Sequence, residues 1–542
     1  MFTHKRLLLK STLAVACCAF IVMAATTLGG CSQNNSASQT TKTDEVTVSM
    51  PTTSEPEKGF DPIYGWGCGE HMHEPLIQST LVKTNTNLEI ENDLATNYSI
   101  SDDGLSITFT IRQDAKFSDG TALTAKDVAF TINKEVEAID NPADFSTIKK
   151  AEATDDYTCV LHMNKANNSV LYLLAVVGIV PADTYNEDTY GSNPIGSGRY
   201  VLESWEKGQK AVFVANDNYY GVAPNIKKLT VLFLNEETSF AYAKAGKTDV
   251  SYVPAQMATN VVDGYSLKSY ETVDSRGISL PTKSANTADL TTEGGVTYEV
   301  GNAVTSDKAI RQALNLAVDR EKLIDSCLYG FGSVSYSVCD NLPWSSDAMK
   351  AQTDVEKAKQ LLDDAGWKIG QDGIREKDGV RCEFDLYYSS SDSARQALAY
   401  AFADQMKEIG VSVNAIGASW DDIYIRQYAD AVLWGWGSNS TDELVQIIKS
   451  DGTCNFPLYE SSSIDTKIDS ALAEKNISDS YSELIEAQSE ISPENEATWV
   501  WLCNVQHTYF VKDGLKVADQ KVHPHGHGWS IVNNVDEWSW SN

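Results

Sequence analysis

The chain has 542 residues, 42% of them hydrophobic, which is enough for about three structural units with cores of their own. With 43 Lys and Arg against 75 Asp and Glu, its net charge of −32 excludes nucleic-acid binding, which depends largely on cationic side chains. Only one stretch, at the N-terminus, is apolar enough to meet a bilayer, and this excludes a protein with several membrane spans.

The N-terminus has the order of charges and apolar residues that is typical of a secretory signal. Three basic residues between positions 5 and 10 precede an apolar run at 13–25, which is short for a membrane span. The run leads into Leu-Gly-Gly-Cys at 28–31, which resembles the bacterial lipobox. We therefore expect lipidation of Cys31 and an extracytoplasmic protein that acyl chains anchor to the cell membrane, at the cell surface or in the periplasm. The alternative is a soluble secreted protein with an incidental cysteine.

The first part of the folded chain shows strand and helix patterns in alternation. Residues 45–50 alternate as a half-buried strand does, and 75–82 carry apolar residues at helical spacing. Another alternating strand is predicted at 105–111. A helix is predicted to start after Thr124, with Asp127 completing a capping box.

Helices and strands also alternate in the second half. Helices are predicted at 307–323, 354–365 and 393–409, and strands at 382–388 and 410–413. The last three of these elements in chain order form a strand-helix-strand unit. This order predicts the α/β class.

Cysteine usage says little about the fold. Seven cysteines follow Cys31, and an odd number outside the cytoplasm leaves at least one free thiol. No C-x-x-C occurs among them. Cys327 and Cys339 are the one candidate pair for a disulfide.

Five segments together resemble one family. They occur in order at 102–112, 117–128, 193–200, 307–320 and 354–366, and they include the run Phe-Ser-Asp-Gly-Thr and a helix of the pattern D-x-x-x-R-Q-A-L. In this order they closely resemble the bacterial extracytoplasmic solute-binding proteins of ABC transporters, family 5, the peptide/nickel class. Most of these positions identify the scaffold and not its cargo.

The resemblance implies an α/β fold of the periplasmic-binding-protein type (type II, cluster C), with two lobes and an extra subdomain inserted in lobe I. The expected organisation is a signal peptide at 1–30, a flexible tether at 31–44, lobe I at 45–75, 195–290 and 505–542, the inserted subdomain at 76–194, and lobe II at 300–504.

The resemblance also implies a division of labour. Such a protein closes on a small ligand and delivers it to an ABC permease, and it makes no bond, so we expect no enzyme and no prosthetic group. The chain has no G-x-x-x-x-G-K-[ST] loop, so ATP hydrolysis belongs to a partner subunit. We expect the receptor itself to be a monomer.

Two groups of histidines suggest a metal as cargo. His71 and His73 lie in a region whose counterpart in the family is near the ligand cleft, and His523, His525 and His527 lie close together near the C-terminus. Imidazole is a natural ligand of nickel, copper and zinc, so these five histidines are candidate contacts for nickel or another transition metal, free or as a chelate. The alternative is that they are structural or solvated.

A second pattern bears on peptides. Peptide-binding relatives commonly hold the α-ammonium group with an Asp three residues after a Trp, but three residues after Trp436 the chain has Asn439. A neutral amide cannot pair with an ammonium group as a carboxylate does, unless Asp442 substitutes. This departure favours a metal chelate or a modified peptide as the ligand.

Tryptophans near this position are candidates for the walls of the site. Trp420, Trp434 and Trp436 could supply flat apolar surfaces against a ligand, and the alternative is that they belong to a core.

Two other functions are alternatives to an importer component. A peptide-sensing surface receptor or adhesin on the same fold cannot be separated from an importer component by sequence. A secreted hydrolase is disfavoured, because the chain has neither a G-x-S-x-G nor an H-E-x-x-H motif.

Overall fold

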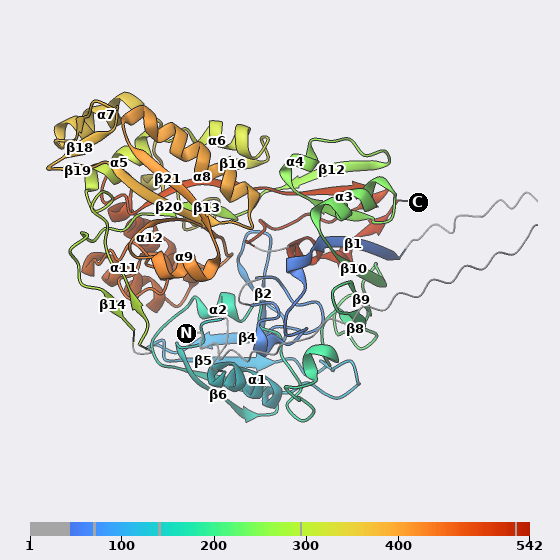
Figure 1. Ribbon diagram of the computed structural model, residues 1–542. Helices are drawn as coiled ribbons and strands as arrows, with labels where there is room; N and C mark the ends of the chain where they lie inside the picture. The colour runs from blue at the N-terminus through green and yellow to red at the C-terminus, as the bar shows by residue number, and fades with distance from the viewer. Residues whose placement is uncertain (1–43, 69–71, 139–142, 293–294, 526–527, 542) are drawn as a thin grey trace, which may run out of the picture. The chain divides into compact units, whose positions relative to one another are not determined.

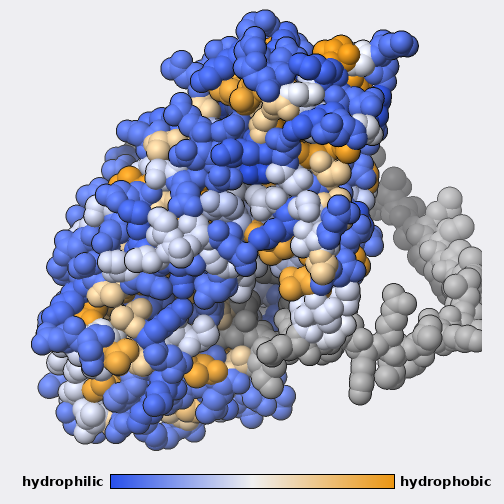
Figure 2. All heavy atoms as spheres, turned by 90° about the vertical axis from the view of Figure 1, so that its left-hand side faces the viewer, coloured by the Kyte–Doolittle hydropathy of each residue, from blue (hydrophilic) through white to orange (hydrophobic). Residues whose placement is uncertain are grey.

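The computed structural model describes residues 44–68, 72–138, 143–292, 295–525 and 528–541 (Figure 1). The predicted signal peptide, almost all of the tether, and Cys31 therefore lie outside the described residues. Within those ranges, no helix is long and apolar enough to cross a membrane. The surface face in Figure 2 is mostly hydrophilic, with hydrophobic residues scattered over it.

A seven-stranded sheet joins the start of the folded chain to its end. Its central strand β1 (Glu45–Pro51) pairs in parallel with its neighbours on both sides. The predicted strand is confirmed, but partly exposed and buried residues alternate only over 45–48, and Ser49 and Met50 are both buried, as is usual for a strand inside a parallel sheet. The strand order is β12 (Tyr265–Tyr270), β24 (His507–Lys512), β11 (Val250–Val253), β1, β10 (Lys228–Leu234), β9 (Lys210–Ala215) and β8 (Tyr200–Glu206). Helices α3 (Glu236–Lys244) and α4 (Ala255–Ala258) precede and follow β11.

The second large sheet has six strands. The order is β16 (Gly332–Val334), β23 (Trp499–Val505), β13 (Ser275–Ser279), β22 (Ala431–Trp436), β20 (Glu383–Ser389) and β21 (Ser412–Ala418). Strand β20 is parallel to both β21 and β22, and α8 (Ser393–Met406) connects β20 to β21. The predicted strand-helix-strand unit is confirmed.

The predicted helix at 307–323 is wrong as a single element. The chain forms two helices, α5 (Lys308–Ala317) and α6 (Arg320–Cys327). Val318 is extended, and the Asp319 side chain accepts a hydrogen bond from the Lys322 N–H, which starts the second helix. The other helices of this half are α7 (Val355–Asp364), α9 (Trp420–Arg426), α10 (Thr441–Ile448), α11 (Ser462–Ala473) and α12 (Ile477–Gln488).

A third, four-stranded sheet lies between β1 and β8 in the sequence. Its order is β4 (Ala95–Ile100), β5 (Ser106–Ile111), β7 (Thr158–Met163) and β6 (Ile148–Asp155), with α1 (Ala125–Glu137) against β6 and β7 and the short α2 (Val170–Leu173) after β7. The predicted cap of α1 is confirmed, since the Asp127 carboxylate accepts the Thr124 N–H at 2.8 Å.

The helix predicted at 75–82 is wrong. Its apolar residues are buried. Its carbonyl groups accept hydrogen bonds from a neighbouring extended segment: the Gly198 N–H donates to Ile77 O and the Tyr200 N–H donates to Leu76 O. Two partners remote in sequence therefore replace the local hydrogen bonds of a helix. Only the end of the segment is regular, as the start of β2 (Val82–Thr84), which pairs with β3 (Ile90–Asn92).

The predicted disulfide is also wrong, because in the described part of the chain all seven thiols, including Cys327 and Cys339, are free. One difference concerns the predicted lobe boundaries. Strand β13 lies inside the range 195–290 but pairs with β22 and β23 of the six-stranded sheet.

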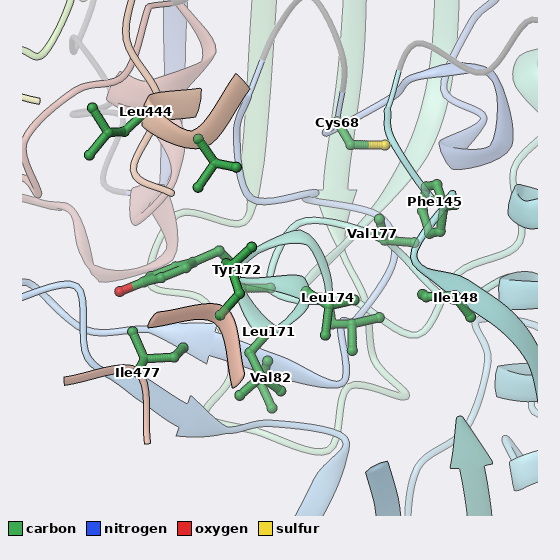
Figure 3. Packing of buried hydrophobic residues seen from close by; sticks show 14 of the residues in the cluster. Cys68, Val82, Phe145, Ile148, Leu171, Tyr172, Leu174, Val177, Leu444 and Ile477 are labelled. Atoms are coloured by element: carbon green, nitrogen blue, oxygen red, sulfur yellow. The ribbon is translucent and has the colours of Figure 1, made fainter. Parts of the chain in front are cut away.

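The inserted segment packs against helices from the other half of the chain. One hydrophobic cluster contains Val82, Leu171, Leu174, Leu444 and Ile477, and Figure 3 shows several of these side chains turned toward one another. Polar contacts cross the same seam: the hydroxyls of Tyr172 and Tyr481 lie 3.1 Å apart, and Asn168 Nδ2 donates to Ala471 O at 2.9 Å. These contacts bring segments about 300 residues apart into one core.

Candidate functional site

Three helices begin at the carboxyl ends of three adjacent parallel strands. Strands β20, β21 and β22 are followed by α8, α9 and α10, and the side chains of Asp392, Ser419 and Ser440 cap these helices. In open α/β sheets, ligands bind outside the carboxyl ends of the strands. This edge of the six-stranded sheet is therefore the candidate binding site (Figure 1).

The three predicted tryptophans lie together at this edge. Trp420 stacks on Trp434 with ring centroids 5.9 Å apart, and Trp434 stacks on Phe456 at 4.2 Å. The Trp434 indole is buried and donates to Ser279 Oγ at 2.9 Å, so its polar atom is satisfied within the protein. Trp436 lies 6.1 Å from Phe456 and is only partly buried. Its Nε1 is buried and has no hydrogen-bond acceptor among the described residues.

Asn439 lies on the turn that follows β22. Its Nδ2 donates to Val522 O at 3.0 Å, which ties the turn to the C-terminal segment of the chain. Its Oδ1 is buried and accepts no hydrogen bond from any residue that the structure describes. A buried acceptor without a donor is costly, so this atom is a candidate contact for a ligand.

Asp442 lies in the first turn of α10, where its N–H donates to Ser440 Oγ at 3.1 Å. Burial raises the pKa of its carboxyl to about 6, and the charge of Asp144 adds to this, while Gln446 and Lys165 act in the opposite direction. Asp144 and Lys165 belong to the inserted segment. The structure thus places Asp442 beside that segment.

Two predicted metal ligands, His523 and His525, lie in a hydrogen-bonded network. His523 Nδ1 lies 3.2 Å from His507 Nδ1, and His507 Nε2 lies 3.4 Å from Asp274 Oδ2. His525 Nδ1 lies 2.5 Å from Asp274 Oδ1. Burial lowers the pKa of His523 well below its usual value, and His507 adds to this.

His73 lies elsewhere, in the core of the seven-stranded sheet. Its ring packs edge-on against Trp66 at 4.4 Å and stacks on Trp529 at 5.5 Å, and its Nδ1 lies 3.0 Å from Glu74 O. His71 and His527 lie outside the described residues. Within the described ranges, no three His, Cys, Asp or Glu side chains are grouped to hold a metal ion, and the metal assignment of these histidines stays a prediction.

Two buried arginines that the sequence did not predict lie at the same edge. Arg276 of β13 pairs with Asp274, and Arg395 of α8 binds Asp392 at 2.5 Å and lies over the Trp420 ring at 5.4 Å. Both are more than nine-tenths buried, and neither Nε has an acceptor among the described residues. The sequence signal that could have indicated them is Gly435, the glycine between the two tryptophans of β22, which marks a place where other side chains come close to the strand.

Gly435 makes room for both arginines. It lies opposite Arg276 in the sheet, and a Cβ at this position would be 2.2 Å from Arg395 Nη2 and 3.0 Å from Arg276 Nη1. We expect Gly435→Ala to lower the free energy of unfolding by about 1–3 kcal/mol through overpacking, measured by urea unfolding. In an Arg395→Ala background the same change should cost less, and equal costs in both backgrounds would contradict this account.

A polar cavity of about 360 Å³ lies next to the segment that Asn439 contacts. Its lining includes Val522 and His523, together with residues of 74–93, 198–219 and 530–537. The charged side chains on its wall are largely paired with one another, as in Arg199 with Asp536 at 2.6 Å and Lys521 with Glu74.

Known proteins resemble the chain in sequence and in fold. The model of the bacterial extracellular solute-binding proteins, family 5 middle region, matches residues 89–453. Protein XP55 of Streptomyces lividans is 32% identical over 443 residues, 78% of this chain and 77% of that protein. The oligopeptide-binding protein AppA of Bacillus subtilis is 26% identical over 453 residues, 78% of this chain and 79% of that protein.

The same fold occurs in solved structures. The crystal structure of NikZ from Campylobacter jejuni in complex with Ni(L-His) superposes with a TM-score of 0.73 at 24% identity, over 92% of this chain and 99% of that one. The predicted two-lobe α/β fold is thereby confirmed. Since the family model matches more than half of the sequence, the resemblance is confirmed as well: this chain is a substrate-binding protein and belongs to the bacterial extracellular solute-binding proteins of family 5.

Proposed function

We propose that this protein is the lipid-anchored, extracytoplasmic receptor of an ABC importer, which captures a small solute between its two lobes and delivers it to the permease. The observation that carries the proposal is the pair of buried, unpartnered atoms Trp436 Nε1 and Asn439 Oδ1, unpartnered as far as the structure describes the chain. They flank a turn that contacts the C-terminal segment at Val522. Shortly before Val522, the chain passes from β23 of the six-stranded sheet directly into β24 of the seven-stranded sheet.

The ligand that this site favours is a metal chelate, with nickel bound to histidine as the first candidate. Asn439 offers an amide in place of the carboxylate that would hold a free α-ammonium group. Trp420 and Trp436 supply apolar walls, and the NikZ structure holds Ni(L-His) on the same fold. The histidines at 71, 523, 525 and 527 remain the proposed metal contacts, whereas the buried ring of His73 packs on Trp66 and Trp529 and is withdrawn as a contact.

An oligopeptide is the second candidate. It is favoured by the similarity to AppA, which has been crystallised with a nonapeptide on the same fold at a TM-score of 0.68. In this case Asp442, whose carboxyl is partly buried nearby, is the candidate partner of the peptide's ammonium group.

The remaining features belong to the same proposal. Cys31 carries the lipid, residues 31–44 form the tether, and the lobes follow the predicted division at 76–194 and 300–504, with β13 counted to lobe II. The receptor acts as a monomer, without a prosthetic group and without catalysing a reaction. A permease and an ATPase subunit move the cargo.

The test is native mass spectrometry of the protein purified from its own host, followed by calorimetry. We expect a co-purified small molecule, and we expect binding of the nickel–histidine chelate to be tighter than binding of a nonapeptide. A bound ligand should also raise the melting temperature by mass action. Absence of any bound mass, together with no heat from either probe, would contradict the proposal.

A further inference from the structure

Glu443 holds the turn that carries the candidate ligand atoms. It lies in the first turn of α10, and its two carboxylate oxygens accept separate backbone N–H groups: Gly437 N–H at 3.0 Å and Ser438 N–H at 2.8 Å. Hydrogen bonds from backbone N–H groups to a carboxylate are stronger than those between neutral groups. The peptide units between Trp436 and Asn439 are thereby fixed to α10.

The same turn is wedged between two other segments. Gly437 has φ of 151°, and a Cβ on it would lie 2.0 Å from Val273 O, so this backbone approach requires glycine. On its other side, Gly437 O accepts the His525 N–H at 2.6 Å, and Asn439 Nδ2 donates to Val522 O. A small movement of the turn therefore moves its contacts to both neighbouring segments.

We propose that Glu443 is a positioning residue for ligand binding, which sets the places of Trp436 Nε1 and Asn439 Oδ1 through its two hydrogen bonds to the turn. The inference rests on the proposed function, since it concerns the same site. The ionised carboxylate accepts both N–H groups, one on each oxygen. In the protonated form one oxygen carries a proton, which would point at the N–H donor. Protonation of Glu443 therefore loosens the turn and weakens binding.

Glu443 changes its protonation in an accessible pH range. Burial raises the pKa of its carboxyl to about 7, the two N–H groups act in the opposite direction, and the charges of Asp442 and Asp274 raise it further. Asp442 lies on the same helix and Asp274 at the start of β13, while the thiols of Cys339 and Cys454 also face it. We expect affinity to be full above pH 7 and to fall as the pH drops through 7.

Stability should respond to pH in the opposite direction. Because the folded pKa lies above the usual value of 4.5, the contribution of Glu443 to the free energy of unfolding is fully present below pH 4.5 and is lost as the pH rises through 7. The opposite trends of affinity and stability separate a positioning role from a purely structural one.

The experiment compares the wild type with Glu443→Gln, which keeps the shape but accepts one N–H at most. We expect amide hydrogen exchange at Gly437 and Ser438 to be about tenfold faster in the variant. For the nickel–histidine chelate or the nonapeptide, we expect affinity to fall by about tenfold above pH 7 and the inflection near pH 7 to disappear. The control is Glu321→Gln, an exposed glutamate in the first turn of α6.

Unchanged exchange at Gly437 and Ser438 would overturn the inference, and so would an unchanged inflection in a binding curve. If neither probe binds the wild type, the proposed ligands fail, and the exchange rates still decide the role of Glu443. Circular dichroism shows whether Glu443→Gln folds. If it does not fold, the wild type alone decides through the pH dependence of its amide exchange. We then expect exchange at Gly437 and Ser438 above pH 7 to be slower than the intrinsic rate at that pH predicts.

Discussion

Asn439→Asp should convert the site toward peptides with a free amino terminus. A carboxylate at this position can form a charge-assisted hydrogen bond with an α-ammonium group, which the Asn439 amide cannot. We expect the affinity for a nonapeptide to rise by about ten- to a hundredfold, the range that corresponds to one hydrogen bond to a charged group. Isothermal titration calorimetry of wild type and variant measures the change.

The matched control is the same nonapeptide with an acetylated N-terminus, which should gain nothing. The variant also loses the hydrogen bond from Asn439 Nδ2 to Val522 O, so its unliganded form should be less stable than the wild type by about 1–3 kcal/mol. Asn439→Ala reports that loss separately. Equal gains for the free and the acetylated peptide would contradict a role of position 439 in ammonium capture.

Local chemistry made the elements predictable where it agreed with the final fold. The strand at 45–50 and the cap formed by Thr124 and Asp127 depend on neighbours within a few residues, and both are confirmed. The segment 75–82 has a helical pattern, but its carbonyls are taken by residues 198–200, which no local pattern reveals. The break between α5 and α6 at Val318 could not be predicted, because an aspartate such as Asp319 occurs both inside helices and as a helix cap.

The site was predictable only in part, for the same reason. Trp434, Trp436 and Asn439 lie close in sequence, so a motif could point to them. Asp274, by contrast, meets His507 and His525 across 233 and 251 residues, and only the folded chain brings them together. The role of the C-terminal histidines as metal contacts stays a prediction, and the structure shows His523 in contact with His507 and His525 in contact with the buried Asp274 carboxylate.

Loss of the Asp274 carboxylate should cost several kcal/mol of stability, as is expected when one partner of a buried ion pair is removed. Its side chain is 8% exposed and pairs with the equally buried Arg276, with His507 and His525 on its other sides. Burial opposes its ionisation, but Arg276 first, and then His525 and His507, outweigh this and hold its pKa well below the usual range. Asp274→Ala leaves the Arg276 guanidinium buried without its partner, and we expect the free energy of unfolding to fall by about 3–5 kcal/mol.

Two comparisons decide whether the buried charge is the cause. Asp372→Ala removes the carboxylate of another Asp–Arg pair, with Arg381 at 2.5 Å, in which both side chains are about half exposed, and it should cost far less stability than Asp274→Ala because solvent screens this pair. The double variant Asp274→Ala with Arg276→Met removes both charges and should regain most of the lost stability, because no unpaired guanidinium remains. If the double variant is as unstable in urea as Asp274→Ala alone, the loss comes from the histidine contacts and not from the arginine.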